Sequence, residues 1–206
     1  MKGWSILALV LGLGVAPMET SARDSKKVER ALLTFYWIVD ESSSRYDGKR
    51  DAELLDVRGR LIVRTHRRFR KELLMEGSGR LRDGRVVVFH KKLNGVNRFR
   101  ISNTRYGRTS RGCALVPYRT IAVDPGVVPL GSKVFIPQLA GTKLPDGSTH
   151  DGVFLATDRG QFRGAHVDVF VGAGAAAAKP FTRRGYRSRS RVTLHVQGTM
   201  RARCTR

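Results

Sequence analysis

Three aspartates are the residues of this chain whose type and spacing could do chemistry. Asp124 follows the apolar letters IAV, Asp158 follows FLAT, and Asp168 interrupts the segment HVDVF. A glycine or a proline comes soon after each acid. Because such apolar segments predict buried strands, we expect the acids near strand ends, where they can line a cleft. Two or three convergent carboxylates are typical of acid–base cleavage of glycosidic bonds.

The segment around Asp168 also predicts which way this carboxyl points. Side chains alternate along a strand, so His166, Asp168 and Phe170 share one face and the intervening valines share the other. The valine face is expected in the core. Asp168 should therefore point toward a cleft or the mouth of a barrel.

The rest of the chain predicts an all-β fold with little helix. Pairs such as Asp83-Gly84 and Asn94-Gly95 lie between apolar segments and are typical of tight hairpin turns. Residues 69–75 fit a helical turn or a strand equally well. The main strands are expected near residues 31–39, 120–124, 132–137, 152–158, 165–171 and 191–197. Many short strands with glycine and proline between them favour a barrel or a sandwich.

The beginning of the chain predicts export. A positive residue precedes an apolar stretch over residues 4–16, and small residues follow it, as in a secretory signal peptide. The stretch is shorter than the roughly 20 residues that span a bilayer. We therefore expect a signal peptide at 1–22, a flexible N-terminus at 23–30 and a single domain at 31–206, without a transmembrane span after signal removal. The expected location is the periplasm, the outer membrane or the exterior; an uncleaved anchor is the alternative.

The net charge of +22 predicts adhesion to polyanions. In an exported protein these are the anionic polymers of the cell envelope. A basic surface is also typical of nucleic-acid binding. Here no zinc-finger spacing, basic helix or aromatic RNA-binding signature accompanies the charge, so nucleic acid is not the expected partner.

The cysteines and histidines do not predict a metal site. Cys113 and Cys204 are the only cysteines, and neither belongs to a CxxC or Cys/His pattern. In an oxidising compartment the pair can form one disulfide, with two free thiols as the alternative. No glycine-rich phosphate loop is present, so no cofactor is expected.

From about 117 to 196, the chain resembles the three-aspartate (3D) domain. This domain forms the catalytic half of membrane-bound lytic transglycosylase A and occurs in secreted cell-wall proteins. Five pieces match in order: AVD at 122–124, VPLG at 128–131, VFIP at 134–137, ATDRG at 156–160 and GAHVDVF at 164–170. The resemblance implies a six-stranded double-psi β-barrel with extra N-terminal strands. It also implies peptidoglycan as the substrate, cleaved between N-acetylmuramic acid and N-acetylglucosamine with a 1,6-anhydro product.

The resemblance also implies roles for individual residues. Asp168 would be the general acid and then the base, and Asp158 would assist by shifting its pKa or by stabilising positive charge on the sugar. For Asp158, holding the turn at Gly160 is an equal alternative, and for Asp124 organising a turn is the stronger one. The expected substrate-binding residues are Asp124, Glu76, Ser78 and His166.

Two departures from the family pattern change the expected cleft. The loop at 159–164 is one residue shorter than is usual, and Phe162 stands where isoleucine is common. No large insertion precedes the aspartates, which predicts a shallower groove. Two other functions stay open: a wall-binding barrel whose acids are structural, and a glycoside hydrolase that uses two carboxylates and water.

Overall fold

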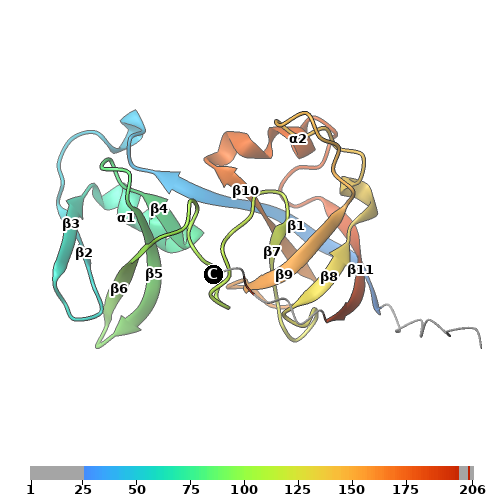
Figure 1. Cartoon of the computed structure of the whole chain (residues 1–206), viewed down its shortest axis with the longest axis horizontal. Helices are drawn as coiled ribbons and strands as arrows, with labels where there is room; N and C mark the ends of the chain where they lie inside the picture. The colour runs from blue at the N-terminus through green and yellow to red at the C-terminus, as the bar shows by residue number, and fades with distance from the viewer. Residues whose placement is uncertain (1–25, 200–203, 205–206) are drawn as a thin grey trace, which may run out of the picture.

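The computed structural model describes residues 26–199 and residue 204. Figure 1 shows two lobes side by side, a barrel at the right and a smaller sheet at the left. The long strand β1 (Lys26–Asp40) runs through both lobes. The predicted signal peptide at 1–22 lies outside the described residues.

The first residues of β1 differ from the expectation of a flexible N-terminus. Lys26 pairs with Val196 of β11 (Arg191–Thr199), and Val28 pairs with Leu194. Val28 is also buried in the barrel core. Pairing with a strand from the far end of the chain therefore orders a segment whose local composition is polar.

Six strands close into the barrel. They are β1, β7 (Thr120–Val123), β8 (Ser132–Phe135), β9 (Val153–Arg159), β10 (His166–Ala173) and β11. Their order is β10-β7-β9-β8-β11-β1, and the ring closes because β1 also pairs with β10. The β1–β10 and β7–β9 pairs are parallel, and the other pairs are antiparallel. The predicted all-β fold with a six-stranded double-psi barrel is confirmed.

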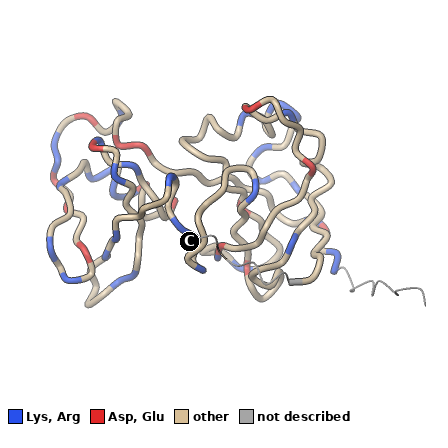
Figure 2. The backbone as a smooth tube through the Cα atoms, in the orientation of Figure 1, with Lys and Arg blue, Asp and Glu red and all other residues tan. Residues whose placement is uncertain are grey.

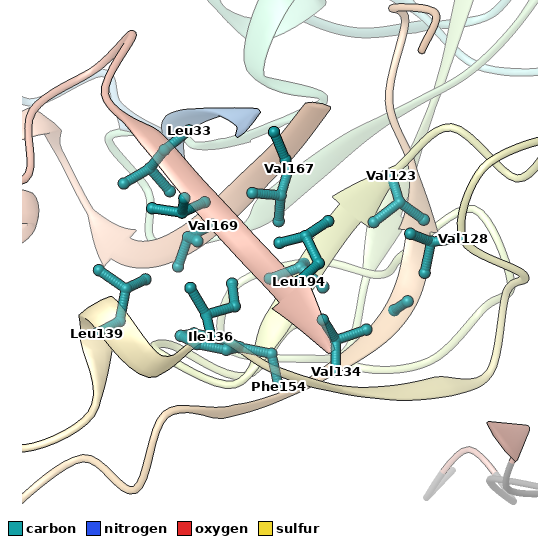
Figure 3. Packing of buried hydrophobic residues seen from close by; sticks show 14 of the residues in the cluster. Leu33, Val123, Val128, Val134, Ile136, Leu139, Phe154, Val167, Val169 and Leu194 are labelled. Carbon is teal, nitrogen blue, oxygen red and sulfur yellow. The ribbon is translucent and has the colours of Figure 1, made fainter. Parts of the chain in front are cut away.

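Apolar side chains from every barrel strand fill the interior (Figure 3). Leu33, Val134, Phe154, Val169 and Leu194 are all fully buried. Burying a side chain of this size stabilises the fold by about 1.5 to 3 kcal/mol. This core sets the inward face of each strand, and so it decides which side chains are left on the outer face.

Short helical segments follow β8 and β10. They are η2 (Pro137–Leu139), η3 (Ala175–Ala178) and α2 (Lys179–Thr182). Phe181 of α2 is fully buried and stacks on Phe35 of β1 at 5.7 Å between ring centroids. Phe181 and Ala178 therefore anchor α2 and η3 to the barrel core.

The smaller lobe contains the extra strands. Its elements are η1 (Ser44–Tyr46), β2 (Ala52–Leu55), β3 (Leu61–Thr65), α1 (Arg67–Glu76), β4 (Ser78–Arg80), β5 (Val86–Leu93) and β6 (Val96–Ser102). The sheet continues from β1 in the order β4-β5-β6-β2-β3. Val39, Phe69, Leu73 and Phe99 belong to a hydrophobic cluster of this lobe. The sequence predicted one barrel without a second wall, whereas the structure shows a second lobe with its own core.

Helix α1 resolves the ambiguous segment at 69–75. His66 caps the helix, because its side chain accepts a hydrogen bond from the backbone of Arg68. The helix ends at Gly77, whose φ of 82° is left-handed, a conformation that glycine adopts without strain. This ending makes Glu76 the last helical residue, directly before β4.

The hairpin turns follow the local sequence. Leu54 and Val63 pair across β2 and β3, on either side of Arg58-Gly59. Asn94 and Gly95, with φ of 47° and 77°, join β5 to β6. Two consecutive positive φ values are typical of the type I′ turn that Asn-Gly favours.

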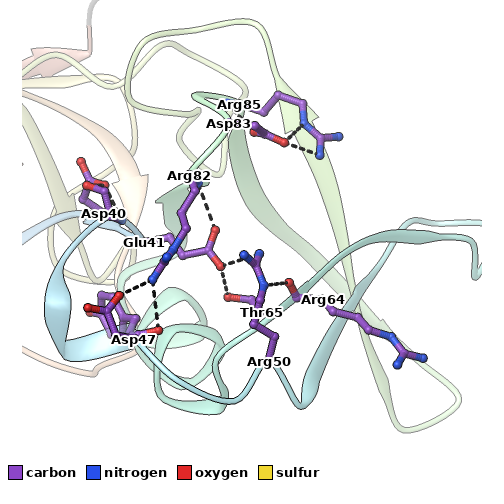
Figure 4. Close-up of polar contacts among 11 residues, drawn as sticks. Asp40, Glu41, Asp47, Arg50, Arg64, Thr65, Arg82, Asp83 and Arg85 are labelled. Carbon is purple, nitrogen blue, oxygen red and sulfur yellow. Dashed lines mark hydrogen bonds and ion pairs between the residues drawn. The ribbon is translucent and has the colours of Figure 1, made fainter.

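A buried carboxylate connects the segments of the smaller lobe (Figure 4). Glu41 is 2% exposed. It accepts hydrogen bonds from the Thr65 hydroxyl, the Arg50 guanidinium and the Arg82 backbone. Removing one partner of a buried ion pair is costly because it leaves the other charge unpaired. Glu41 therefore joins the end of β1 to β3 and to the β4–β5 turn.

We expect Gly152→Ala to lower the free energy of unfolding by about 2 kcal/mol. Gly152 has a φ of +80°, and an added Cβ would lie 2.8 Å from the Phe135 ring and 3.0 Å from the Ile136 carbonyl oxygen. Urea denaturation measures the change. Gly147→Ala is the matched control, because Gly147 has a similar φ of +83° but nothing within 4 Å. An equal loss in both variants would show that the crowding at Gly152 is unimportant.

Candidate functional site

The outer face of β10 carries the candidate acid. Val167 and Val169 lie in the barrel core, so Asp168 lies on the opposite face, as the alternation predicted. On the neighbouring strand β1, Thr34 pairs with Asp168 and Tyr36 pairs with Phe170. The parallel pairing of β1 with β10 therefore places a threonine and a tyrosine on the same face as the acid.

A β-bulge in β9 brings Asp158 to this face. Ile121 of β7 pairs with Ala156, but the next residue, Ala122, pairs with Asp158, so Thr157 is an extra residue. Ala156 is fully buried in the core, and strict alternation would point Asp158 inward as well. The bulge reverses this direction, as bulges near active sites often do.

The two acids flank β7. Asp168 of β10 and Asp158 of β9 both pair with Ala122. Neighbouring strands are about 4.8 Å apart, so the two Cα atoms are about 10 Å apart. At that separation the carboxyls share one surface without forming a direct pair.

Asp168 has the environment of a proton donor. One carboxylate oxygen, Oδ1, accepts a hydrogen bond of 2.8 Å from the Thr34 hydroxyl. Burial raises the pKa of Asp168 to about 6; the Thr34 hydrogen bond opposes this rise, and the charge of Asp158 adds to it. Within the described part of the chain, no lysine or arginine forms an ion pair with Asp168. A carboxyl of this kind holds its proton at mildly acidic pH.

Asp158 is held by three donors. Its Oδ1 accepts hydrogen bonds from the backbone of Ser110 at 2.7 Å and of Arg159 at 2.9 Å. Its Oδ2 accepts a hydrogen bond of 3.2 Å from the hydroxyl of Tyr36. Burial raises the pKa of Tyr36 well above 10, and the nearby carboxylates add to the rise. The tyrosine therefore stays protonated and fixes the orientation of Asp158.

Glu76 brings a third carboxyl from the smaller lobe. Its Oε2 accepts a hydrogen bond of 3.1 Å from the backbone of Trp37 in β1. Burial raises the pKa of Glu76 to about 7; the bond from Trp37 opposes this rise, and the charge of Asp168 adds to it. Glu76 therefore interacts electrostatically with the Asp158–Asp168 cluster. Its position at the end of α1 places it there.

His166 lies beside Asp168 but contacts it only through Thr34. Its Nε2 is 2.8 Å from the Thr34 hydroxyl oxygen. The ring of Phe162 stacks on the imidazole, with 3.6 Å between centroids and 22° between planes. Phe162 also covers Gly160, where an added Cβ would overlap the ring. The shortened loop at 159–164 therefore supplies one wall of the site.

A hollow of about 320 Å³ adjoins this loop. Asp124, Gly126, Gly160 and Phe162 are among the residues that line it. Its lining includes Phe162 of the His166–Phe162 stack but neither His166 nor Asp168.

Two of the expected substrate-binding residues, Asp124 and Ser78, are buried in this structure. Asp124 uses Oδ1 for the backbone N–H of Gly126 and Oδ2 for that of Gly164. These bonds lower the pKa of Asp124, so its carboxylate anchors the short loop. The Ser78 hydroxyl is buried without a hydrogen-bond partner, next to Gly107.

Three residues of the cluster were missed by sequence reasoning. For Tyr36 core packing was the default expectation and stacking on a sugar the alternative; it is buried, and its hydroxyl also reaches Asp158. No local sequence pattern marks Thr34 or Ser110 as a site residue, because their roles depend on contacts with distant segments of the chain. Alternation in residues 31–39 puts Thr34 and Tyr36 on one face, which is the only local indication.

Cys113 and Cys204 form a disulfide, with 4.6 Å between Cα atoms. Cys113 ends a tight turn in which its carbonyl accepts a hydrogen bond from Thr109. Ser110, which binds Asp158, belongs to the same turn. The disulfide therefore fixes the segment that positions one of the acids.

The described residues contain neither a metal-binding cluster nor a membrane-spanning helix. Within 26–199 and at 204, no group of three or more His, Cys, Asp or Glu side chains could hold a metal ion. No helix of this part of the chain is long and apolar enough to cross a membrane. Figure 2 shows lysine and arginine spread over both lobes rather than gathered in one stripe.

The family comparison identifies the aspartate-bearing part of the barrel. Residues 119–193 match the family model described as the 3D domain. This match contains all three aspartates and confirms the resemblance that the sequence predicted. No curated protein matches the chain.

Solved structures extend the likeness to most of the chain. MltA of Escherichia coli with bound chitohexaose aligns with a TM-score of 0.56 and 11% identity, covering 84% of this chain and 73% of that one. The membrane-bound lytic murein transglycosylase of Agrobacterium tumefaciens aligns with a TM-score of 0.53 and 16% identity, covering 81% and 73%. The chain therefore has the fold of these lytic transglycosylases, including the smaller lobe.

Proposed function

We propose that this protein is a peptidoglycan lytic transglycosylase in which Asp168 is the general acid and then the general base. One observation carries the proposal: Asp168 is partly buried on the outer face of β10, forms no ion pair with a lysine or arginine among the described residues, and has a pKa that burial raises to about 6. A structural aspartate would instead use its carboxylate for backbone donors, as Asp124 does.

The proposed reaction needs two proton transfers at Asp168: one proton is given to the leaving group and another is taken from the nucleophile. Asp168 donates its proton to the glycosidic oxygen as the bond between N-acetylmuramic acid and N-acetylglucosamine breaks. The resulting carboxylate accepts the proton of the muramic acid 6-hydroxyl, whose oxygen closes the 1,6-anhydro ring. The acid is then restored, and water is not consumed.

Asp158 is the proposed electrostatic partner. Its three hydrogen bonds hold the carboxylate in place on the face shared with Asp168. From there it can stabilise positive charge that develops on the sugar ring. Its charge also contributes to the raised pKa of Asp168.

The proposal includes export, because peptidoglycan lies outside the cytoplasmic membrane. The predicted signal peptide at 1–22 and the net charge of +22 support it. A strongly basic protein binds anionic envelope polymers in a salt-dependent way. The relative with bound chitohexaose supports a glycan strand as the ligand.

The test is incubation of the purified mature chain with peptidoglycan sacculi, followed by mass spectrometry of the soluble products. Asp168→Ala is the inactive variant. Asp146→Asn is the control, because Asp146 is exposed and binds only its own turn. We expect anhydromuropeptides from the wild type and from the control, and none from Asp168→Ala.

Each other result supports a different function. Products with reducing ends would indicate a hydrolase that uses two carboxylates and water. Salt-sensitive binding to sacculi by all variants without any release would overturn the enzyme proposal in favour of a wall-binding barrel.

A further inference from the structure

Asp168 ends a chain of contacts that begins on the shortened loop. Phe162 stacks on the imidazole of His166. Nε2 of His166 lies 2.8 Å from the Thr34 hydroxyl oxygen, and this hydroxyl lies 2.8 Å from Oδ1 of Asp168. A residue that does not touch Asp168 is thus connected to it through one hydroxyl group.

Counting protons limits these hydrogen bonds to two arrangements, which differ in the tautomer of His166. A threonine hydroxyl has a single proton to donate. When Thr34 donates that proton to Oδ1 of Asp168, its oxygen can only accept from His166, so Nε2 of the imidazole must carry a hydrogen. If Nε2 carries no hydrogen, Thr34 donates to His166 and a proton on Asp168 sits on Oδ1, facing Thr34.

We propose that His166, held in place by Phe162, is a positioning residue that acts through Thr34 to keep the transferable proton of Asp168 on Oδ2. This inference rests on the proposed function of Asp168. The His166 Nε2–H donates to Thr34, Thr34 donates to Oδ1, and the proton of the acid is left on the oxygen that Thr34 does not occupy. No proton crosses the chain during the reaction.

The other ionisable groups near Asp168 do not supply this directional contact. Tyr36 of β1 donates to Asp158 rather than to Asp168. Asp158 of β9 acts on Asp168 through its charge, and the charge of Asp168 in turn raises the pKa of Glu76 at the end of α1. Burial lowers the pKa of His166, so the imidazole is neutral at neutral pH. Among the described residues, the hydrogen bond from Thr34 is therefore the contact that can select one oxygen of Asp168.

The first experiment needs no substrate and reads the pKa of Asp168 directly. The ¹³C chemical shift of its carboxyl is followed against pH, with Asp168→Asn used for assignment. Thr34→Val removes the hydroxyl but keeps the shape, and should raise the pKa of Asp168 by about one pH unit. His166→Phe keeps the aromatic stack but removes the donor, and should raise the pKa in the same direction by less.

The double variant separates a connected chain from two independent effects. Thr34→Val combined with His166→Phe should give the same pKa for Asp168 as Thr34→Val alone, because His166 acts only through the hydroxyl. His90→Phe is the control, since His90 lies in β5 of the smaller lobe. If His166→Phe leaves the pKa of Asp168 unchanged, or if its effect adds to that of Thr34→Val, the inference is overturned.

The second experiment measures the pH profiles of kcat and KM for release of anhydromuropeptides. Thr34→Val and His166→Phe should each lower kcat about tenfold with little change in KM, because proton placement and not binding is affected. Thr34→Ser, which keeps a hydroxyl, and His166→Gln, which keeps an amide donor, should recover most of the loss. A loss in KM alone would overturn the positioning role.

Failure of the proposed function is distinguishable from failure of this inference. If the wild type releases no product, the enzymatic proposal fails, but the carboxyl titration still decides whether His166 acts on Asp168. Thermal unfolding of each variant shows whether it is folded. His166→Gln replaces His166→Phe in the titration if the latter is unfolded, and the pKa of Asp168 should then stay close to that of the wild type.

Discussion

Asp168→Asn is expected to lower kcat for glycan release about a thousandfold and, at pH 8, to raise the free energy of unfolding by about 3 kcal/mol. The amide keeps the shape of the side chain and can still accept a hydrogen bond from Thr34. It cannot donate and recover a proton as the carboxyl does. The same substitution also removes a charge that the folded state buries at a cost.

The gain in stability has a defined pH window. The carboxyl ionises near 3.8 when unfolded and at about 6 when folded. The folded state therefore holds the proton more tightly, and its stability relative to the unfolded state falls as pH rises from about 4 to 6. Above this window the penalty is complete. The difference in unfolding free energy between Asp168→Asn and the wild type should be small at pH 4 and largest above pH 7.

Urea denaturation at a series of pH values measures this difference. Asp146→Asn is the control: hydrogen bonds from Ser148 lower the pKa of Asp146, so its own titration lies at lower pH and its effect on stability should be constant above about pH 5. Glu76 provides a second readout. The charge of Asp168 contributes to its raised pKa, so that pKa should fall in Asp168→Asn. If Asp168→Asn is less stable than the wild type at pH 8, the ionised carboxylate stabilises the fold. The assignment of a raised pKa to Asp168 would then be wrong.

Removal of the disulfide is the second large effect. Cys113→Ala combined with Cys204→Ala should lower the free energy of unfolding by about 4 kcal/mol, because the cross-link restricts the unfolded chain. The cysteines are 91 residues apart in sequence. The measurement is denaturant unfolding of both proteins, with and without a thiol reductant.

The same double variant should also lower kcat several-fold. Ser110 donates its backbone N–H to Asp158 and accepts a hydrogen bond from Arg159 through its hydroxyl. Loosening the turn that holds Ser110 weakens the placement of Asp158. Reductant should reproduce both effects in the wild type and change nothing in the double variant. Full activity without the disulfide would show that the barrel alone holds Ser110.

Local patterns predicted much of the fold and one of the two acids. Alternation around Asp168 needs only the period of a strand and a valine face to bury, and both are written in seven consecutive residues. Asn94-Gly95 likewise specified its turn through backbone conformations that few other residues adopt. The order of the aspartate-bearing pieces carried the resemblance to the 3D domain, and that resemblance implied the double-psi barrel.

The second lobe had no comparable signal. Its hydrophobic cluster combines Val39, Phe69 and Phe99, which are far apart in sequence. Phe69 and Phe99 also lie in segments rich in charge. Such a core exists only after the segments have packed. The sequence therefore predicted extra strands, but not the lobe that they form beside the barrel.

The sequence by itself determined that this chain folds into short strands in a barrel or a sandwich, and that Asp168 faces away from the core; the resemblance to the 3D domain implied the barrel. Only the tertiary structure decided how the site is assembled. The bulge at Thr157 turns Asp158 outward, and the pairing of β1 with β10 puts Thr34 against Asp168. Both depend on register between strands far apart in the chain, which no local pattern of side chains specifies.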